Sequence, residues 1–434
     1  MAGAANVLKG AKNRLLPASI PFRFFGAAVV FHVLAWLLLL AGAPAATGFA
    51  GGLGLPLAAL HAVTLGVLVM TAIGASLQLL PVATAQAIGS PRLLALLWWL
   101  YAPAVALLVA GMALAAPWLL AAGALAVTLA LLCYAALLAG NLARARGMPV
   151  VVAHSWTALA SLAVLLWAAD SLAGAYVGAS LLARGTALLL HVAFAVYGFM
   201  GLLVLGFSYI LVPMFALADT PAQRPALVSA ACAGIGLLCS GAAAVEVAPV
   251  WTLPLAALAG LLAFGLHLRL MLHALRSGMR RELGRSFVLV RVGWAALATS
   301  LVLALGLALA DRPLPYFEHT RTLFGVLSVG ALLTFLLGML GRIVPFLASM
   351  HAPPGRRGAQ LPSALTAERP LAWHFHCHLA AMAALLLAVA ADSAWLARAA
   401  ALVGLTGALA FGRFFWFAWR RMATPPTLID AKLP

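Results

Sequence analysis

The stretch His61–Gln86, HAVTLGVLVMTAIGASLQLLPVATAQ, is a continuous apolar segment long enough to cross a membrane as one helix. Two later stretches share its frame: His191–Asp219, HVAFAVYGFMGLLVLGFSYILVPMFALAD, and His319–Met350, HTRTLFGVLSVGALLTFLLGMLGRIVPFLASM. Each begins with a histidine, carries two glycines eight residues apart and reaches a proline near its end. These three helices decide the architecture.

The copies recur at a constant offset of 132 residues, without insertion or deletion. Four columns keep this spacing: Gly66, Gly198 and Gly330; Gly74, Gly206 and Gly338; Pro81, Pro213 and Pro345; and Arg92, Arg224 and Arg356. A fixed period indicates internal repeats. We therefore predict one membrane domain over residues 1–434, built from three units at approximately 15–145, 146–280 and 281–425. The glycines are expected to allow close helix packing, and each proline to end its helix.

The composition requires a lipid bilayer around the chain. Of its 434 residues, 65% are hydrophobic and only 8% are charged, whereas about a quarter of the residues of a soluble protein carry charge. The sequence predicts an all-α polytopic membrane protein with twelve transmembrane helices, at 20–44, 55–81, 93–115, 117–141, 150–170, 181–214, 225–245, 251–274, 286–310, 320–346, 371–391 and 396–419.

The formal charge of +17 follows the topology of the spans. Most Lys and Arg residues fall before the first span, in alternate loops or after the last span. Cytoplasmic loops are the ones enriched in these residues, so both termini are expected in the cytoplasm of a bacterial inner-membrane protein. The basic residues are then explained by anionic lipid headgroups, and no nucleic-acid partner is expected.

An even number of spans in each unit makes the three copies parallel, with a pseudo-threefold axis along the membrane normal. This arrangement resembles subunit I of the heme-copper oxidases, whose second, sixth and tenth helices line the interior. The segment HAVTLGVLVMTAIGASLQLLPVATAQAIGSPRLL, residues 61–94, is similar to that family's second helix and the turn after it. The resemblance implies that His61 is an axial ligand of a heme b.

The same resemblance fails at the family's copper site. Ala193 and Ala195 stand where the sixth helix of the family has an acidic residue and a tyrosine. The seventh span, 225–245, has no histidine, although the family's seventh helix supplies a His-His pair. Oxygen reduction at the usual site is therefore not expected, and whether the chain is a redox enzyme stays open.

The residues leave the second axial ligand of the heme open. In the repeat frame His191 differs from His61 by only about 3 Å in depth, whereas His319 lies about 9 Å higher. Arg342 is a deep basic residue, suited either to pair with a heme propionate or to extend to the cytoplasmic surface.

The tenth span and the segment after it also resemble the NnrS family. The residues that carry this resemblance are His319, Arg342, His351, Gly355 and Arg356. It implies a multi-span protein that binds heme and copper and is associated with nitric oxide stress. The second span departs from the family, because it has one histidine where NnrS has a His-x-His pattern.

A second group of histidines lies toward the cytoplasm, in WHFHCHLAAM at residues 373–382. His374 and His378 are one helical turn apart and share a face, so they can hold a metal ion such as copper, while His376 points away. His351 lies near the same surface and is a further candidate ligand. The alternative, of equal weight, is interfacial histidines bonded to headgroups and loop carbonyls. His32, in the first span, is expected to bond to a neighbouring helix.

Two other classes of protein compete with a heme protein that has an electron-donating membrane partner. A transporter or permease without a redox cofactor commonly has twelve spans, although the parallel triplication argues against it. A scaffold subunit without a cofactor would use all its histidines structurally. An intramembrane histidine is usually functional, and this favours the heme protein.

Overall fold

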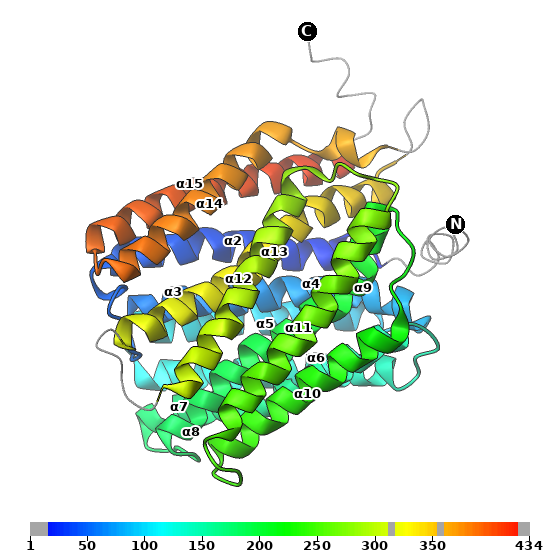
Figure 1. Cartoon of the computed structure of the whole chain (residues 1–434). Coiled ribbons are helices and arrows are strands. Elements are labelled where there is room, and N and C mark those ends of the chain that lie inside the picture. The colour runs from blue at the N-terminus through cyan, green and yellow to red at the C-terminus, as the bar shows by residue number, and fades with distance from the viewer. Residues whose placement is uncertain (1–15, 311–316, 354–359, 424–434) are drawn as a thin grey trace.

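The computed structural model describes residues 16–310, 317–353 and 360–423, which form helices and short connections (Figure 1). Within these residues there is no strand, and twelve helices are long and apolar enough to cross a membrane. This confirms the predicted all-α polytopic fold and its twelve spans. Gly355 and Arg356, which belong to the NnrS resemblance, lie outside the described residues.

Of the twelve spans in the described chain, the second and sixth are each built from three helical pieces and the other ten have one main helix. The main helices are α2 (Ser19–Gly42), α5 (Pro91–Ala113), α6 (Pro117–Leu142), α7 (Pro149–Gly174), α10 (Gln223–Ala244), α11 (Thr252–Ser277), α12 (Gly284–Leu309), α14 (Glu368–Ala390) and α15 (Ala394–Ala423). The second span joins α3 (Leu55–His61), η3 (Ala62–Val69) and α4 (Met70–Thr84), the sixth joins α8 (Arg184–Ala193), η5 (Phe194–Met200) and α9 (Gly201–Ala216), and the tenth is α13 (Phe317–His351).

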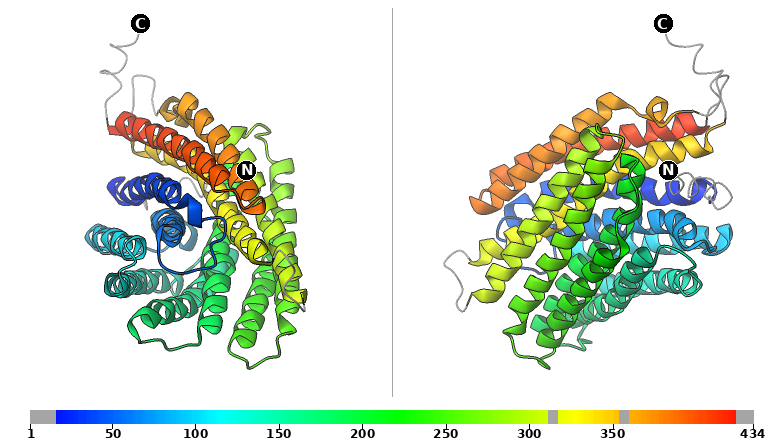
Figure 2. Two further views of the ribbon diagram at one scale, coloured as in Figure 1. Left: turned by 90° about the vertical axis from the view of Figure 1, so that its left-hand side faces the viewer. Right: turned by 45° about the vertical axis from the view of Figure 1, so that its right-hand side comes forward.

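The helices follow one another around the bundle in chain order. Seen near its end, the blue and cyan helices of the first third, the green helices of the middle third and the yellow to red helices of the last third form adjacent sectors (Figure 2). Consecutive helices pack as antiparallel pairs, and α15 packs along α2 and closes the ring.

Three spans form the inside of this ring. The second, sixth and tenth spans have 67%, 61% and 67% of their most apolar window buried, whereas no other span of the described chain exceeds 44%. They also contact one another, through α4 with α9 and through α13 with η3, η5 and α9. These are the three spans that share the sequence frame, so the most similar segments of the chain line its interior.

The recurring glycines allow the inner spans to lie close to the helix that precedes each of them in the ring. A Cβ atom at Gly74 or Gly206 would lie 2.8 Å from the Cβ of Phe24 or His154. At Gly338 it would lie 2.6 Å from the backbone carbonyl oxygen of Ser286. The packing role predicted for these glycines is confirmed.

The expectation that the recurring prolines end their helices is wrong. Pro81, Pro213 and Pro345 lie inside α4, α9 and α13, which continue for several residues beyond them. A proline is tolerated inside a membrane helix when its surroundings satisfy the freed backbone groups. The first two helices end instead at Ala85 and Leu217, whose left-handed φ angles of 56° and 54° break the helical path.

Two inner spans contain a π-helical segment, a rare conformation that is found mostly at functional sites. In the second span it begins at Ala62, directly after His61, and in the sixth at Phe194, three residues after His191. The two starting points are 132 residues apart. The threefold repeat stays a prediction, and this shared irregularity supports it for the first two units.

One buried hydrogen bond between spans allows a stability prediction. The Ser76 hydroxyl donates to the Ile73 carbonyl oxygen (3.0 Å), so its oxygen accepts from the Tyr134 hydroxyl (2.8 Å). Ser76→Ala leaves the fully buried tyrosine hydroxyl unpaired, which costs about 1–3 kcal/mol, whereas Tyr134→Phe removes only the donor and costs about 1 kcal/mol. Thermal unfolding in detergent should give the lower melting temperature for Ser76→Ala; the reverse order would contradict this assignment of the donor.

Candidate functional site

Five of the eleven histidines are buried among the helices. His32, His154, His267, His374 and His378 each expose 2% or less of their surface. The interfacial interpretation is therefore wrong for His374 and His378, and His376 is exposed as expected. A buried imidazole needs a partner for both ring nitrogens, so the unpaired nitrogens indicate where the chain can bind something else.

The first group of histidines is a pair on two inner spans. His61, at the end of α3, and His191, in α8, have ring centroids 6.1 Å apart and ring planes at 34°. The Nδ1–H of His61 donates to the Leu57 carbonyl oxygen (3.0 Å), which leaves the lone pair on Nε2. The Nδ1 of His191 is buried without a hydrogen-bond partner in the described part of the chain. We call these two residues the outer pair.

The outer pair fits two axial ligands of one iron atom. Axial ligands of a heme are on opposite sides of the iron, so with metal–nitrogen bonds of roughly 2 Å their ring centres are roughly 6 Å apart, and the rings observed are 6.1 Å apart. A carbonyl that accepts the other N–H is also the usual support of a metal-binding histidine. The structure therefore brings together His61 and His191, the two histidines that the repeat frame predicts at similar depth.

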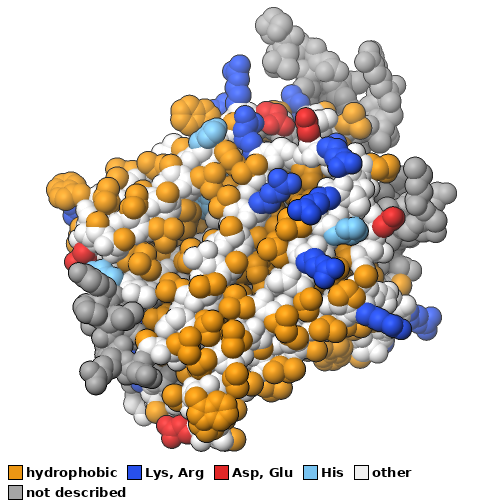
Figure 3. Space-filling view, viewed as in Figure 1, with side chains coloured by type: hydrophobic (Ala, Val, Ile, Leu, Met, Phe, Trp, Pro, Cys, Tyr) orange, Lys and Arg blue, Asp and Glu red, His pale blue; other side chains and the backbone are white. Residues whose placement is uncertain are grey.

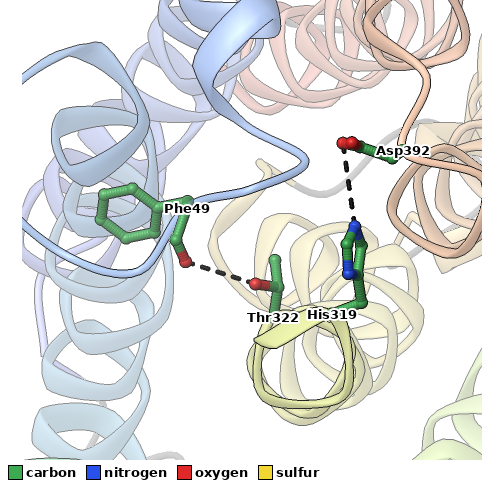
Figure 4. A network of polar contacts seen from close by, with 4 residues as sticks. All are labelled: Phe49, His319, Thr322 and Asp392. Atoms are coloured by element: carbon green, nitrogen blue, oxygen red, sulfur yellow. Dashed lines mark hydrogen bonds and ion pairs between the residues drawn. The ribbon is translucent and has the colours of Figure 1, made fainter. Parts of the chain in front are cut away.

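His319 lies in a different setting, near the start of α13. Its Nε2 forms a long ion pair with Asp392 (3.9 Å), and the side chains are 35% and 63% exposed. One turn further on, Thr322 donates to the Phe49 carbonyl oxygen (3.3 Å), so this end of α13 is held by two loops (Figure 4). The described partner of His319 is thus Asp392, which does not belong to the outer pair.

Arg342 lies near the opposite end of α13. It is 23 residues from His319 in one continuous helix, about 35 Å along the axis. Its guanidinium donates to the Leu283 carbonyl oxygen, directly before α12. Arg342 therefore joins two helices at that end, and its pairing with a heme propionate stays a prediction.

The second group of histidines is the inner triad, formed by His32 of α2 with His374 and His378 of α14. The ring of His374 lies 6.1 Å from that of His32 and 5.6 Å from that of His378. His32 accepts from Trp36 of its own helix (3.1 Å) and contacts α14 through its ring. The hydrogen bond expected between His32 and another helix is thus replaced by one within α2.

His351 is held by the backbone instead. Its Nδ1 lies 2.9 Å from the Leu347 carbonyl oxygen and its Nε2 lies 2.9 Å from the Leu16 carbonyl oxygen. Because both ring nitrogens are already close to carbonyl oxygens, His351 is poorly suited to bind a metal. The sequence suggested His351 as the third histidine beside His374 and His378, but the ring that lies next to His374 is that of His32.

A third group lies between α7, α9, α11 and α12. The Tyr209 ring is 5.4 Å from that of His154 and 5.0 Å from that of His267, which in turn lies 6.5 Å from Trp294. Both nitrogens of His267, the His154 Nε2 and the Trp294 indole N–H are buried without hydrogen-bond partners among the described residues. Sequence reasoning missed this group, although histidines inside predicted spans were its signal.

No three or more His, Cys, Asp or Glu side chains in the described part of the chain are close enough together to hold a metal ion by themselves. Each histidine group therefore offers at most two imidazoles to one ion. Such a site suits a heme iron, whose other four ligands come from the porphyrin, or a metal ion of low coordination number.

The comparisons with known proteins agree with this fold. The chain is similar to the solved structure described as "Cryo-EM structure of a heme-copper terminal oxidase dimer provides insights into its catalytic mechanism", with a TM-score of 0.59 and 13% sequence identity over 96% of this chain and 85% of that one. No family model and no curated protein matches the sequence. The chain is thus a polytopic membrane protein with a heme-copper oxidase-like fold, and at this identity the similarity establishes the fold alone.

Proposed function

We propose that this protein is a heme-binding integral membrane protein that holds a heme b between His61 and His191. The observation that carries the proposal is the outer pair, whose two imidazoles lie 6.1 Å apart on neighbouring inner spans. The bound heme would supply one-electron chemistry. The protein contributes the two ligands, the Leu57 carbonyl that orients one of them, and the π-helical segments beside both.

The role we propose is electron transfer or a response to nitric oxide, with copper as a second cofactor and an electron-donating membrane protein as partner. The NnrS resemblance suggests this role, and the heme-copper oxidase-like fold is compatible with it. Oxygen reduction at a family-type copper site is not part of the proposal, because the seventh span, Gln223–Ala244, contains no histidine.

A transporter is the competing function, and the interior gives it little support. The cavity between the three inner spans is small and apolar, with Thr71 and Ala75, Met200 and Phe207, and Leu336 among its lining residues. A path for a polar solute would need polar groups along it. Absence of heme from the purified protein would nevertheless favour the transporter.

The proposed orientation places both termini in the cytoplasm of a bacterial inner membrane. Most Lys and Arg side chains in view gather on the side where α2 begins and α15 ends, while much of the rest of this face is apolar (Figure 3). Alkaline phosphatase fused after Val247 should therefore be active, and fused after Gly278 inactive. The opposite pattern would contradict the orientation but would leave the heme site untouched.

A further inference from the structure

We propose that the inner triad binds one copper(I) ion through His374 Nε2 and His378 Nδ1, with the Met382 thioether as third ligand and His32 as a positioning residue. This inference deepens the proposed function, because it specifies the copper site, and it rests on that proposal only for the choice of copper. The argument depends on which nitrogen of each ring carries the proton.

His374 has a lone pair facing no described partner. Its Nδ1 lies 3.0 Å from the Gly407 carbonyl oxygen, which can only accept, so Nδ1 carries the proton and donates it. In the neutral ring the lone pair is then on Nε2, which is buried without a hydrogen-bond partner. A carbonyl that fixes the tautomer in this way is typical of metal-binding histidines.

His378 presents a second lone pair. The Thr334 hydroxyl donates to the Gly330 carbonyl oxygen (2.7 Å), so its oxygen accepts from the His378 Nε2–H at 2.9 Å. The lone pair of His378 is therefore on Nδ1, which is also buried and unpaired. Two adjacent turns of α14 thus offer two unprotonated nitrogens.

His32 has the opposite tautomer. The Trp36 indole N–H can only donate, and it donates to His32 Nε2 at 3.1 Å. The neutral ring of His32 then carries its proton on Nδ1, again buried without a partner. His32 is therefore a hydrogen-bond donor next to His374, suited to hold a further small ligand of the metal, and is not itself a ligand.

The ring spacing distinguishes a metal ion from a bridging water. Imidazoles joined through one water have ring centres roughly 6 to 7 Å apart, from hydrogen bonds of about 2.8 Å. Two imidazoles on one three- or four-coordinate metal ion have ring centres roughly 5 to 6 Å apart, because their bond angle is smaller than that of opposite heme ligands. The 5.6 Å between His374 and His378 lies within the second range.

Charge and ligand type favour copper(I) over a divalent ion. The side chains in hydrogen-bond or ring contact with the triad, Trp36, Thr334 and Phe411, are uncharged. Since burial of a charge without a counter-charge is costly, a monovalent ion is preferred there. Met382 lies one turn beyond His378 and packs against Gly330, whose carbonyl holds Thr334. Thioether ligands select copper(I).

The test is copper(I) titration of the detergent-purified, heme-loaded protein against a chromogenic copper(I) chelator. Wild type should bind one copper(I) ion per chain. His374→Ala and His378→Ala should lose it, and Met382→Leu and His32→Phe should weaken it about 10-fold or more. The matched control is His376→Ala, an exposed histidine on the same helix, which should bind copper as wild type does.

Heme content measured on the same samples separates this inference from the proposed function. Copper loss with the heme spectrum intact supports the triad site. A heme-loaded wild type that binds no copper(I), or His374→Ala and His378→Ala variants that still bind one ion, would overturn it. Leucine and methionine have similar volumes, so Met382→Leu should fold as wild type does. If this variant keeps the wild-type heme content, a lower copper(I) affinity reflects the loss of the thioether and not misfolding.

Discussion

Alanine at either His61 or His191 should reduce the heme content of the purified protein at least about ten-fold, because loss of even a partner that supports a ligand typically costs that much affinity. The two rings, 6.1 Å apart, are on separate inner spans, α3–α4 and α8–α9, so neither replaces the other. Heme is measured as the pyridine hemochrome relative to protein, on samples that elute as single species.

His319→Ala is the control for that experiment. His319 interacts with Asp392 and is partly exposed, so its removal should leave the heme in place. Normal heme content in both outer-pair variants would reject the assignment. Loss of heme in His319→Ala, with retention in His191→Ala, would make His319 the second axial ligand. The sequence alone does not decide between these two histidines.

Leucine at Gly338 is expected to abolish folded protein. A Cβ there would lie 2.6 Å from the Ser286 backbone carbonyl and 3.0 Å from the Leu289 Cβ, so α12 and α13 would have to separate. Backbone atoms cannot move aside as a side chain end can, and overpacking of this kind costs about 3 kcal/mol or more. The yield of monodisperse protein after detergent extraction measures the effect.

Gly325→Leu provides the matched control, on the same helix. A Cβ at Gly325 meets nothing within 4 Å, so this variant should extract as well as wild type. Equal yields for the two leucine variants would show that the recurring glycines are not required for helix packing.

The spans were predictable because a bilayer makes a simple demand. Each crossing needs about 20 apolar residues, and stretches such as 117–141 and 225–245 match α6 and α10 within two residues. The inner position of the second, sixth and tenth spans was implied by the resemblance to the heme-copper oxidases, whose corresponding helices line the interior, and the burial of these spans agrees with it. The fold class and the proximity of His61 and His191 could therefore be predicted from the chain.

The partners of the other histidines could not be predicted. His32 and His374 are far apart in the chain and meet only because α15 closes the ring against α2 and brings α14 with it. Tyr209 and His267 likewise meet across two helices. The π-helical segments after His61 and near His191 are also invisible in the apolar pattern, because a one-residue change in the helical turn leaves hydropathy unchanged.

The central claim, that the outer pair holds a heme, is tested most directly by the absorption spectrum of the purified wild-type protein, oxidised and then reduced with dithionite, together with its iron content. The account predicts a low-spin b-type spectrum with a sharp α-band on reduction and about one iron per chain, as two imidazole ligands require. A colourless, iron-free protein that is folded and monodisperse would contradict it.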